Sequence, residues 1–247
     1  AAGELVTTGG LIQVVADGGV NANLPADLSA KGLKAARDIV IGDGEVTVNA
    51  ADDALHSDAD LTIEDGRLYL DTGDDAVKAE GTVTISGGSL AVTTSYEGIE
   101  GLKVLITGGT VNVNARDDAI NAAEEGINEF AVSQKASITI TGGNVTAYGG
   151  TDGLDSNGTI TIWGGSIFVM GSSTNGLGEG GLDANGALTF HGGILVAGGV
   201  SSTTATPSNT STRTFAQYTW SGDVAANTLV HLGTAQGQQI AAVRIPR

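Results

Sequence analysis

The sequence contains no cysteine, only three prolines, and few aromatic residues, which make up 4% of its 247 residues. The absence of cysteine excludes a disulfide framework, a thiolate zinc site and a cysteine nucleophile. No apolar run approaches the roughly 18 residues of a membrane-spanning helix. The chain also does not begin with a basic segment followed by an apolar one. We therefore expect no membrane insertion and no signal peptide within this sequence.

Basic residues are scarce as well: 11 lysines and arginines stand against 28 acids, for a net charge of -17. This excess repels phosphate backbones and anionic lipids, so nucleic acid is not an expected partner, whereas cations are. Glycine is abundant, with 39 residues, and the apolar share is 40%. A chain with many glycines and few aromatic rings favours a thin core extended along an axis over a single large core.

One motif recurs along most of the chain, namely apolar-x-apolar-x-(Gly/Asp)-Gly-x-apolar-x-apolar. Four of the seven spacings between its marker glycines are 21 or 22 residues, and the other three are 28 or 34. The marker glycines are Gly10, Gly44, Gly66, Gly88, Gly109, Gly143, Gly165 and Gly193. The longer spacings predict loops at residues 18–29, 122–135 and 172–178, inserted into a coil of about 22 residues.

Apolar and other residues alternate within each repeat, which predicts β-strands. Equal positions in successive repeats form three apolar columns. They are Ile41, Ile63, Ile85, Ile106, Ile140, Ile162 and Phe190; Val46, Leu68, Leu90, Val111, Val145 and Ile167; and Leu55, Val77, Ile99, Ile120, Leu154 and Leu182. Three columns indicate three walls that face one core. The sequence therefore predicts an all-β fold, a parallel β-helix (solenoid) of about eight coils.

The repeat stops after Gly198, and the Ser/Thr-rich residues 201–214 predict a loop. Two apolar runs, Leu229–Leu232 and Ile240–Ile245, predict a C-terminal β-hairpin that caps the helix end and covers its strand edge. We therefore expect one domain, with the β-helix over residues 1–200 and residues 201–247 packed on its end. An extension of the native chain beyond Arg247 stays open, because the second run ends so close to it.

One corner of the coil is rich in carboxylates. An acid stands nine residues after five of the marker glycines, and most of these acids have further polar neighbours one residue before and three residues after. The acids are Asp53, Asp75, Glu97, Asp118 and Asp152; the residues before them are Asp52, Asp74, Tyr96, Asp117 and Thr151; those after are His56, Lys78, Glu100, Asn121 and Asp155. In stacked coils these positions lie about 4.8 Å apart.

Unit charges at that distance repel by about 3–4 kcal/mol at an effective dielectric near 20. In the middle coils only Lys78 and Arg116 offer compensation, so we expect a bound cation. Calcium fits such a ladder better than magnesium, because it accepts six to eight oxygens in irregular geometry. The alternative is ordinary turn chemistry, in which each acid caps a nearby N–H. The paired acids, such as Asp117 and Asp118, favour the metal, since capping needs only one.

Three segments, 95–100, 116–121 and 151–155, each follow an I-T-I-x-G-G-type strand and resemble the secreted bacterial proteins of the carbohydrate-binding domain-containing family. The resemblance implies a right-handed, pectate-lyase-like β-helix that binds calcium and cellulose-like or pectic polysaccharide. It implies calcium ligands among Asp53, Asp74, Asp75, Glu97, Glu100, Asp117, Asp118, Asp152 and Asp155, and we add Asn121 as a further candidate. His56 and Lys78 depart from the later coils, which argues against a metal in the N-terminal coils.

Aromatic side chains that face outward are the candidates for sugar contacts. Alternation places Tyr69 and Phe168 on the surface together with the three candidates for carbohydrate binding, Tyr96, Tyr148 and Trp163. They form no single stripe, so packing beneath loops explains each of them equally well. An outward threonine column, interrupted by Leu105, is explained by β-propensity alone.

The function that we expect is that of a secreted or cell-surface protein that binds calcium and polysaccharide without cleaving the polysaccharide. One alternative is a structural subunit of a fibre or homo-oligomer. The other is a calcium-dependent polysaccharide lyase, for which Lys78, Lys103 and Arg116 are the basic residues near the ladder. We assign no catalytic residue.

Overall fold

The computed structural model of the chain describes residues 3–21, 25, 28–128, 130–172, 180–199 and 205–245. It divides into two compact units, residues 1–213 and residues 214–247. The described residues contain strands, turns and bends but no helix, so the fold is all-β, as predicted. Among these residues, accordingly, no helix has the length and apolar character needed to cross a membrane.

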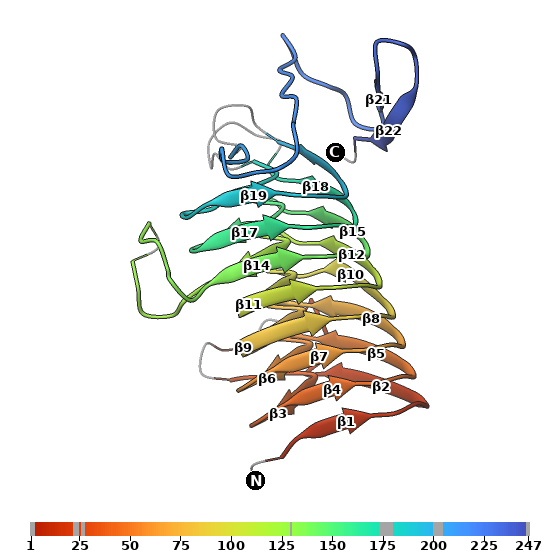
Figure 1. The fold of residues 1–247 in the computed structure, drawn as a ribbon. Coiled ribbons are helices and arrows are strands. Elements are labelled where there is room, and N and C mark those ends of the chain that lie inside the picture. Colours follow the sequence, from red (N-terminus) through yellow and green to blue (C-terminus); the bar gives the residue numbers. More distant parts are fainter. Residues whose placement is uncertain are drawn as a thin grey trace. The chain divides into compact units, whose positions relative to one another are not determined.

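Two parallel sheets run the length of the first unit (Figure 1). The main path of the first sheet is β1 (Leu5–Thr7), β4 (Ile39–Ile41), β7 (Leu61–Ile63), β9 (Val77–Ile85), β11 (Ile99–Ile106), β14 (Ser137–Ile140), β17 (Thr159–Ile162) and β19 (Leu188–Phe190). The second sheet is β2 (Leu11–Ala16), β5 (Glu45–Ala50), β8 (Arg67–Thr72), β10 (Ser89–Thr94), β12 (Thr110–Asn114), β15 (Asn144–Tyr148), β18 (Ser166–Met170) and β20 (Ile194–Gly198). Neighbouring strands therefore come from successive repeats.

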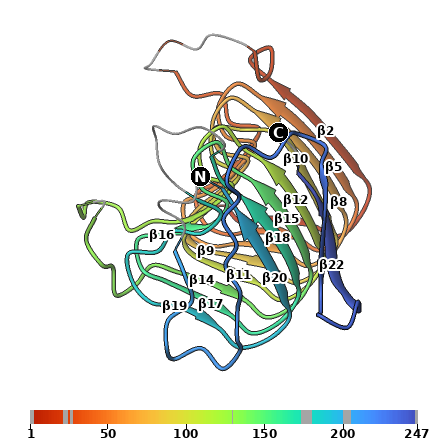
Figure 2. The same ribbon diagram turned by 90° about the horizontal axis from the view of Figure 1, so that it is seen from above.

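A third row of strands consists of β3 (Leu33–Ala35), β6 (Leu55–Ser57), β13 (Ile120–Ala122) and β16 (Asp155–Ser156). It belongs to the first sheet because β9 and β11 are continuous across two walls. The first half of β9 pairs with β6 and its second half with β7. Neither sheet closes on itself. Figure 2 looks down the stack and shows the strands of successive coils lying over one another. The arrangement is compatible with the predicted β-helix or solenoid.

The predicted core columns pair in the predicted register. Ile41 aligns with Ile63, and the first column continues in step to Phe190. In the third column, Leu55 aligns with Val77 and then with Ile99. The members of all three columns are buried and belong to one hydrophobic cluster. Because each coil adds one side chain to every column, the core is long and thin, and the corners of the coil are held at a constant position.

The marker glycines are required by the turn after the first sheet. All eight have positive φ, between 69° and 104°, a region that residues with a Cβ rarely adopt. At Gly66 a Cβ would also lie 2.7 Å from the carbonyl oxygen of Gly44 in the coil before it. The repeat that was visible in the sequence is therefore the repeat of one tight turn, stacked directly on its predecessor.

Of the three predicted loops, the one at 122–135 lies fully between β13 and β14, apart from residue 129, which is outside the described residues. Glu124 fixes it by accepting hydrogen bonds from Lys135 at 2.5 Å and Ser133 at 2.6 Å. The predicted loop at 18–29 is only partly described, without residues 22–24 and 26–27. The third, at 172–178, lies outside the described residues after Ser172.

The Ser/Thr-rich segment is described from residue 205 onward and contains no strand up to residue 213. Its backbone follows β19, where the N–H of Ser208 donates to Leu188 and that of Thr212 to Phe190. This segment therefore covers the hydrogen-bonding edge of the last strand of the first sheet.

The second unit contains the predicted hairpin, formed by antiparallel pairing of β21 (Leu229–Gly233) with β22 (Gln239–Arg244). Gly237, in the connection between them, has a φ of 84°. The cap function of this hairpin stays a prediction.

Candidate functional site

The carboxylate ladder lies where the chain leaves the second sheet and enters the third row of strands. Each acid stands two residues before a member of the third core column, whose register stacks the corners coil upon coil. Asp53, Asp75, Asp118 and Asp152 are buried at this corner, and Glu97 is half-buried. Folding thus withdraws five carboxyl groups from most of their water, which is costly unless each finds a proton or a positive partner.

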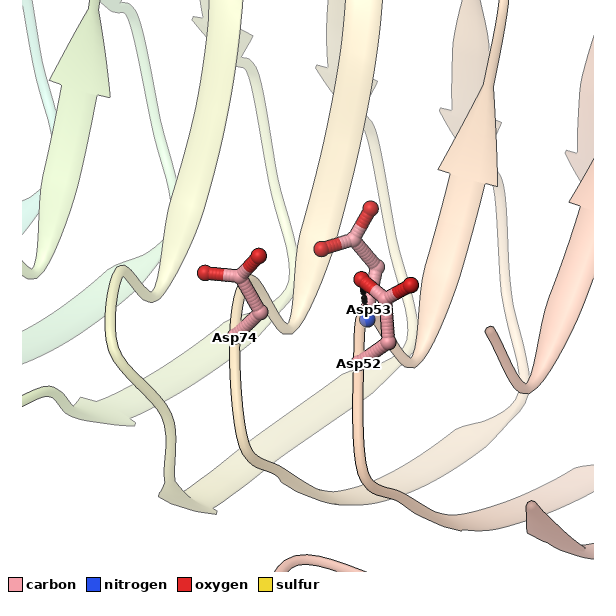
Figure 3. Close-up of side chains that lie close together, drawn as sticks. All are labelled: Asp52, Asp53 and Asp74. Atoms are coloured by element: carbon pink, nitrogen blue, oxygen red, sulfur yellow. Dashed lines mark hydrogen bonds between the residues drawn. The ribbon is translucent and has the colours of Figure 1, made fainter. Parts of the chain in front are cut away.

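The first acidic cluster, Asp52, Asp53 and Asp74, brings together three carboxylates from two coils (Figure 3). Its counter-charge comes from the protein itself. The Lys31 ammonium lies 3.0 Å from Asp52 Oδ1 and 2.5 Å from Asp53 Oδ2. Ser29 donates a further hydrogen bond to Asp52 at 2.5 Å. An ammonium group therefore occupies the position between carboxylates that a metal ion would need.

His56 adds hydrogen bonds to this cluster. Its Nδ1 lies 2.6 Å from Asp53 Oδ2, and its Nε2 lies 3.0 Å from Asp58 Oδ1. Burial opposes ionisation of Asp53, but the hydrogen bonds from His56 and Lys31 outweigh it and lower the pKa of Asp53. For Asp52 burial also opposes, yet Ser29 and Lys31 lower its pKa to about 2. Both carboxyls are therefore ionised at neutral pH.

The second acidic cluster consists of Asp75, Glu97 and Glu100, and among the described residues its only ion-pair partner is Lys78. The ammonium lies 3.5 Å from Asp75 Oδ2 and forms a closer ion pair with Glu100. Burial, followed by the neighbouring Glu100, raises the pKa of Asp75. Burial likewise raises the pKa of Glu97, and Glu100 and Asp75 add to the shift. One cation is thus shared by three acids, two of which favour their protonated form.

The third acidic cluster, Asp152, Asp155 and Asp183, lies in the C-terminal coils. Asp118 stands one coil before Asp152, at the equal position. Within the described ranges, neither Asp118 nor Asp183 forms an ion pair. The positions that hold His56 and Lys78 in earlier coils hold Asn121, Asp155 and Asp183 here. The ladder therefore changes from mixed charge to purely acidic and amide groups along its length.

Asp118 shows the electrostatic consequence. Burial raises its pKa to about 8, and Asp155 and Asp117 contribute further. At the same time, Oδ1 of Asp118 accepts the N–H of Asp152 at 2.9 Å, as Oδ1 of Asp53 accepts the N–H of Asp75 at 3.2 Å. The turn chemistry considered as an alternative is therefore present between coils. These hydrogen bonds use one oxygen of Asp118 and one oxygen of Asp53.

Asn121 supplies a polar oxygen that the protein does not satisfy. Its Nδ2 donates to both oxygens of Glu97, at 3.1 and 3.2 Å. Its Oδ1 is buried and has no hydrogen-bond partner among the described residues. The residue is 8% exposed and pairs in register with Asp155 of the next coil. A buried amide oxygen beside carboxylates is the kind of ligand that a hard cation takes.

The remaining predicted ligand, Asp117, and the aromatic Tyr96 are tied to each other. The Tyr96 hydroxyl donates to Asp117, which raises the pKa of Tyr96 to about 12. Asp117 also accepts the hydroxyl of Thr151 at 2.5 Å, and the Arg116 guanidinium lies 5.8 Å from the centre of the Tyr96 ring. These residues brace the outer side of the corner.

Two ladder members, Lys31 and Asp183, were not among the sequence-predicted ligands. Both stand shortly after a loop insertion, which changes the number of residues in the coil. Counting from a marker glycine therefore misses them. Counting from the third core column finds them, because Lys31 stands two residues before Leu33 and Asp183 one residue after Leu182.

The outward aromatic residues occupy different surroundings. Tyr148 packs edge-on against Phe168, with ring centres 5.8 Å apart, and both are half-buried. Tyr69, on the second sheet, is 48% exposed, and Trp163, on the turn after β17, is 56% exposed. Trp163 stacks on His191 with ring centres 4.1 Å apart. Tyr148 is therefore engaged in packing, whereas Trp163 presents a ring to solvent.

Comparison with known proteins gives one match. A family model described as carbohydrate-binding domain-containing protein matches residues 1–76 and 75–176. These residues contain most of the stacked coils and the ladder up to Asp155. No curated protein and no solved structure matches the chain.

Proposed function

We propose, from the premise that the chain belongs to the family of carbohydrate-binding domain-containing proteins, that it is an extracellular protein that binds polysaccharide without cleaving it. The family membership is the observation that carries this proposal, since the matched residues make up most of the chain. The polysaccharide is cellulose-like or pectic. We further propose that the stacked coils form a right-handed parallel β-helix, the hand that parallel crossovers within a sheet overwhelmingly adopt.

Binding without cleavage is supported by the state of the basic residues. A lyase needs a base beside the sugar carboxylate. The Lys78 ammonium is held by Glu100 and Asp75, and the Arg116 guanidinium donates to the carbonyl oxygens of Ser95 and Gly73. Both are thus committed to neighbouring groups of the protein. Lys103 is exposed on β11, six residues after Glu97 in the sequence.

We propose calcium as the cofactor and place it in the C-terminal part of the ladder. The donor set there fits a hard cation: carboxylates of Asp152, Asp155 and Asp183 lie within 4.8 Å of one another, and the amide oxygen of Asn121 lies one coil away. Oxygen ligands in irregular number suit calcium better than magnesium. Bound calcium would supply positive charge that relieves the repulsion among these acids, and Asp118 would share that benefit.

The N-terminal coils need no such ion under this proposal. Lys31 pairs with two carboxylates of the first acidic cluster, His56 lies within hydrogen-bond distance of one of them, and Lys78 partly neutralises the second cluster. Asp53, Asp74 and Asp75 are therefore expected to serve as partners of protein cations instead of metal ligands.

Affinity electrophoresis tests the proposed function. The protein is run in native gels that contain hydroxyethyl cellulose or polygalacturonate, with calcium or with a chelator. We expect retardation by at least one of these glycans in the presence of calcium, and no unsaturated product that absorbs ultraviolet light. Unretarded migration in both gels would contradict polysaccharide binding. An ultraviolet-absorbing product would favour the lyase alternative.

A further inference from the structure

Trp163 and His191 occupy equal positions in consecutive coils, on the turn that follows the first sheet. The N–H of Trp163 donates to Ile140 and that of His191 to Ile162, each bond reaching the coil before. The two rings are nearly parallel, at 19°, and 4.1 Å apart. Since coils are about 4.8 Å apart, the rings lie one above the other along the stack.

Two contacts hold His191 in place. Nδ1 of His191 lies 3.1 Å from the hydroxyl oxygen of Thr212, and Nε of Arg213 donates to the His191 carbonyl oxygen at 3.1 Å. Both partners belong to the Ser/Thr-rich segment whose backbone is hydrogen-bonded to β19. The indole therefore stacks on a residue whose position is set by these two contacts. Its stacking geometry is established before any ligand arrives, which lowers the entropic cost of binding.

One face of the indole is covered by His191, and the opposite face looks toward the preceding coil. At the equal positions there, the residues are small and exposed: Thr141, then Thr107, then Ser86. A threonine side chain is too short to cover an indole. This agrees with the 56% exposure of Trp163. An aromatic face thus stands at the end of a row of hydroxyl groups.

A second row of hydroxyl groups runs beside the first. Thr139, Thr161 and Thr189 align in register on the outer face of the first sheet. Thr189 donates to Thr161 at 3.2 Å. Thr161 stands two residues before Trp163, on the outer face of β17. Hydrogen-bonding groups therefore border the indole on two sides.

We propose that Trp163, supported by His191, is the stacking platform for one pyranose ring of a neutral, gluco-configured polysaccharide. This inference rests on the proposed function and names its site and ligand class. A pyranose with equatorial hydroxyl groups presents C–H bonds on its faces. These carry partial positive charge and suit the negative face of an indole. Its equatorial hydroxyls point sideways, where Thr141 and Thr161 offer partners.

The charge of the protein favours a neutral glycan over a polyuronate. The net charge of -17 repels a polyanion. At the platform, Arg213 already donates through Nε to the His191 carbonyl. The other aromatic candidates fit less well, because Tyr96 is bonded to Asp117 and Tyr148 is packed on Phe168.

Site-directed variants in the hydroxyethyl cellulose gel test the platform. Trp163→Ala should weaken retention about tenfold, the equivalent of about 1.4 kcal/mol, while Trp163→Phe should keep part of it. Tyr69→Ala is the matched control, since Tyr69 is similarly exposed on the second sheet. With Trp220→Phe as background, Trp163 is the sole tryptophan. Its fluorescence should then shift on addition of cellohexaose and stay unchanged with polygalacturonate.

The outcomes separate this inference from the proposed function. If wild type is retained and Trp163→Ala is retained equally, the platform is wrong and polysaccharide binding stands. If Trp163→Ala and Tyr69→Ala lose retention equally, the platform is also wrong. Retention of wild type by polygalacturonate alone overturns the neutral ligand class. If neither glycan retains wild type, the proposed function fails and the platform fails with it.

Discussion

The N-terminal and C-terminal halves of the carboxylate ladder share one corner geometry but differ in how their charge is balanced. Around Asp53 and Asp75 the counter-charges are Lys31 and Lys78, both within ion-pair distance, and His56 lies within hydrogen-bond distance of Asp53. From Asn121 onward the equal positions hold an amide and two acids. Because equal positions pair in register in both halves, the comparison concerns side chains at matched positions.

This comparison shows that stacking of acids does not by itself create a metal site. Stacked coils bring equal positions close together. In each coil the resulting repulsion between acids can be relieved by a basic residue, by protonation or by an ion from solution. Lys78 is an example of relief by a basic residue, and the raised pKa of Asp118 is an example of relief by protonation. The way in which the repulsion is relieved differs from coil to coil, so a prediction of metal binding must treat the coils separately.

The largest expected effect comes from removing the internal cation of the second acidic cluster. Lys78→Met leaves Asp75, Glu97 and Glu100 without a positively charged partner in the described part of the chain, and loss of one member of a buried ion pair costs about 3 kcal/mol. Denaturant unfolding in chelator should show this loss in the free energy of unfolding. Calcium should then restore part of it, since the variant resembles the C-terminal half.

Lys103→Met is the matched control for this change, because Lys103 is exposed on β11 and forms no ion pair within the described part of the chain. We expect it to change stability little. Equal losses in the two variants would mean that Lys78 contributes only as a surface charge.

Calcium itself should stabilise the wild-type protein through the C-terminal half. An ion that binds only the folded state contributes about 2.7 kcal/mol at one hundred times its dissociation constant. Thermal unfolding should therefore shift upward with calcium, less with magnesium, and downward with chelator. Asp118→Asn and Asp183→Asn should reduce the calcium shift. Asp43→Asn, at the opposite corner, should not; an identical response of all three variants would contradict the metal site.

The pH dependence of stability should differ in sign between Asp118 and Asp52, whose pKa values move in opposite directions. The pKa of Asp118 is raised from 3.8 to about 8 on folding, so its protonated form stabilises the protein below about 3.8 and this contribution is lost as pH rises through about 8. Calcium-free protein should thus become less stable from pH about 5 to about 9. Asp118→Asn should flatten the profile of the melting temperature.

The pKa of Asp52 moves the other way, to about 2, so its contribution is present above about 3.8 and is lost only as pH falls through about 2. Asp52→Asn should therefore leave the slope between pH about 5 and about 9 unchanged. A flattening of that slope in this variant as well would argue against a division of the ladder.

The smallest effect is expected at Asn121, which lies at the boundary of the halves. Asn121→Ala removes the hydrogen bonds to Glu97 but also removes a buried oxygen that has no partner among the described residues. The two consequences oppose each other, so calcium-free stability should fall by at most about 1 kcal/mol. In calcium the loss should be larger. Titration calorimetry that finds unchanged calcium affinity would remove Asn121 from the ligand set.

The sequence was sufficient to predict the all-β class, the parallel sheets and the register of the core columns. The three core columns were found from alternation and spacing, and the structure pairs their members in register because each coil must place one apolar residue on each wall. Marker glycines such as Gly66 were recognisable because the tight turn tolerates no Cβ. The predicted hairpin of β21 and β22 followed from its two apolar runs.

The site was less predictable, because charge balance depends on residues that are distant in sequence. Lys31 stands 21 and 22 residues from its two acid partners and directly after an insertion. Counting residues between repeats fails at this insertion, whereas the pairing of Leu33 with Leu55 identifies the position of Lys31. The stacking of Trp163 on His191 across a 28-residue interval was missed for the same reason. Insertions change the count between equal positions but leave the coil geometry unchanged.

The continuity of β9 and β11 has a consequence for local opening. These strands, nine and eight residues long, cross two walls without a turn and lie in the middle of the stack. Opening either one breaks pairings on both walls at once, whereas the shorter strands at the ends of the stack have fewer bonds to lose. Amide hydrogens of β9 and β11 should therefore exchange slowest, and the coils should fray inward from both ends toward them.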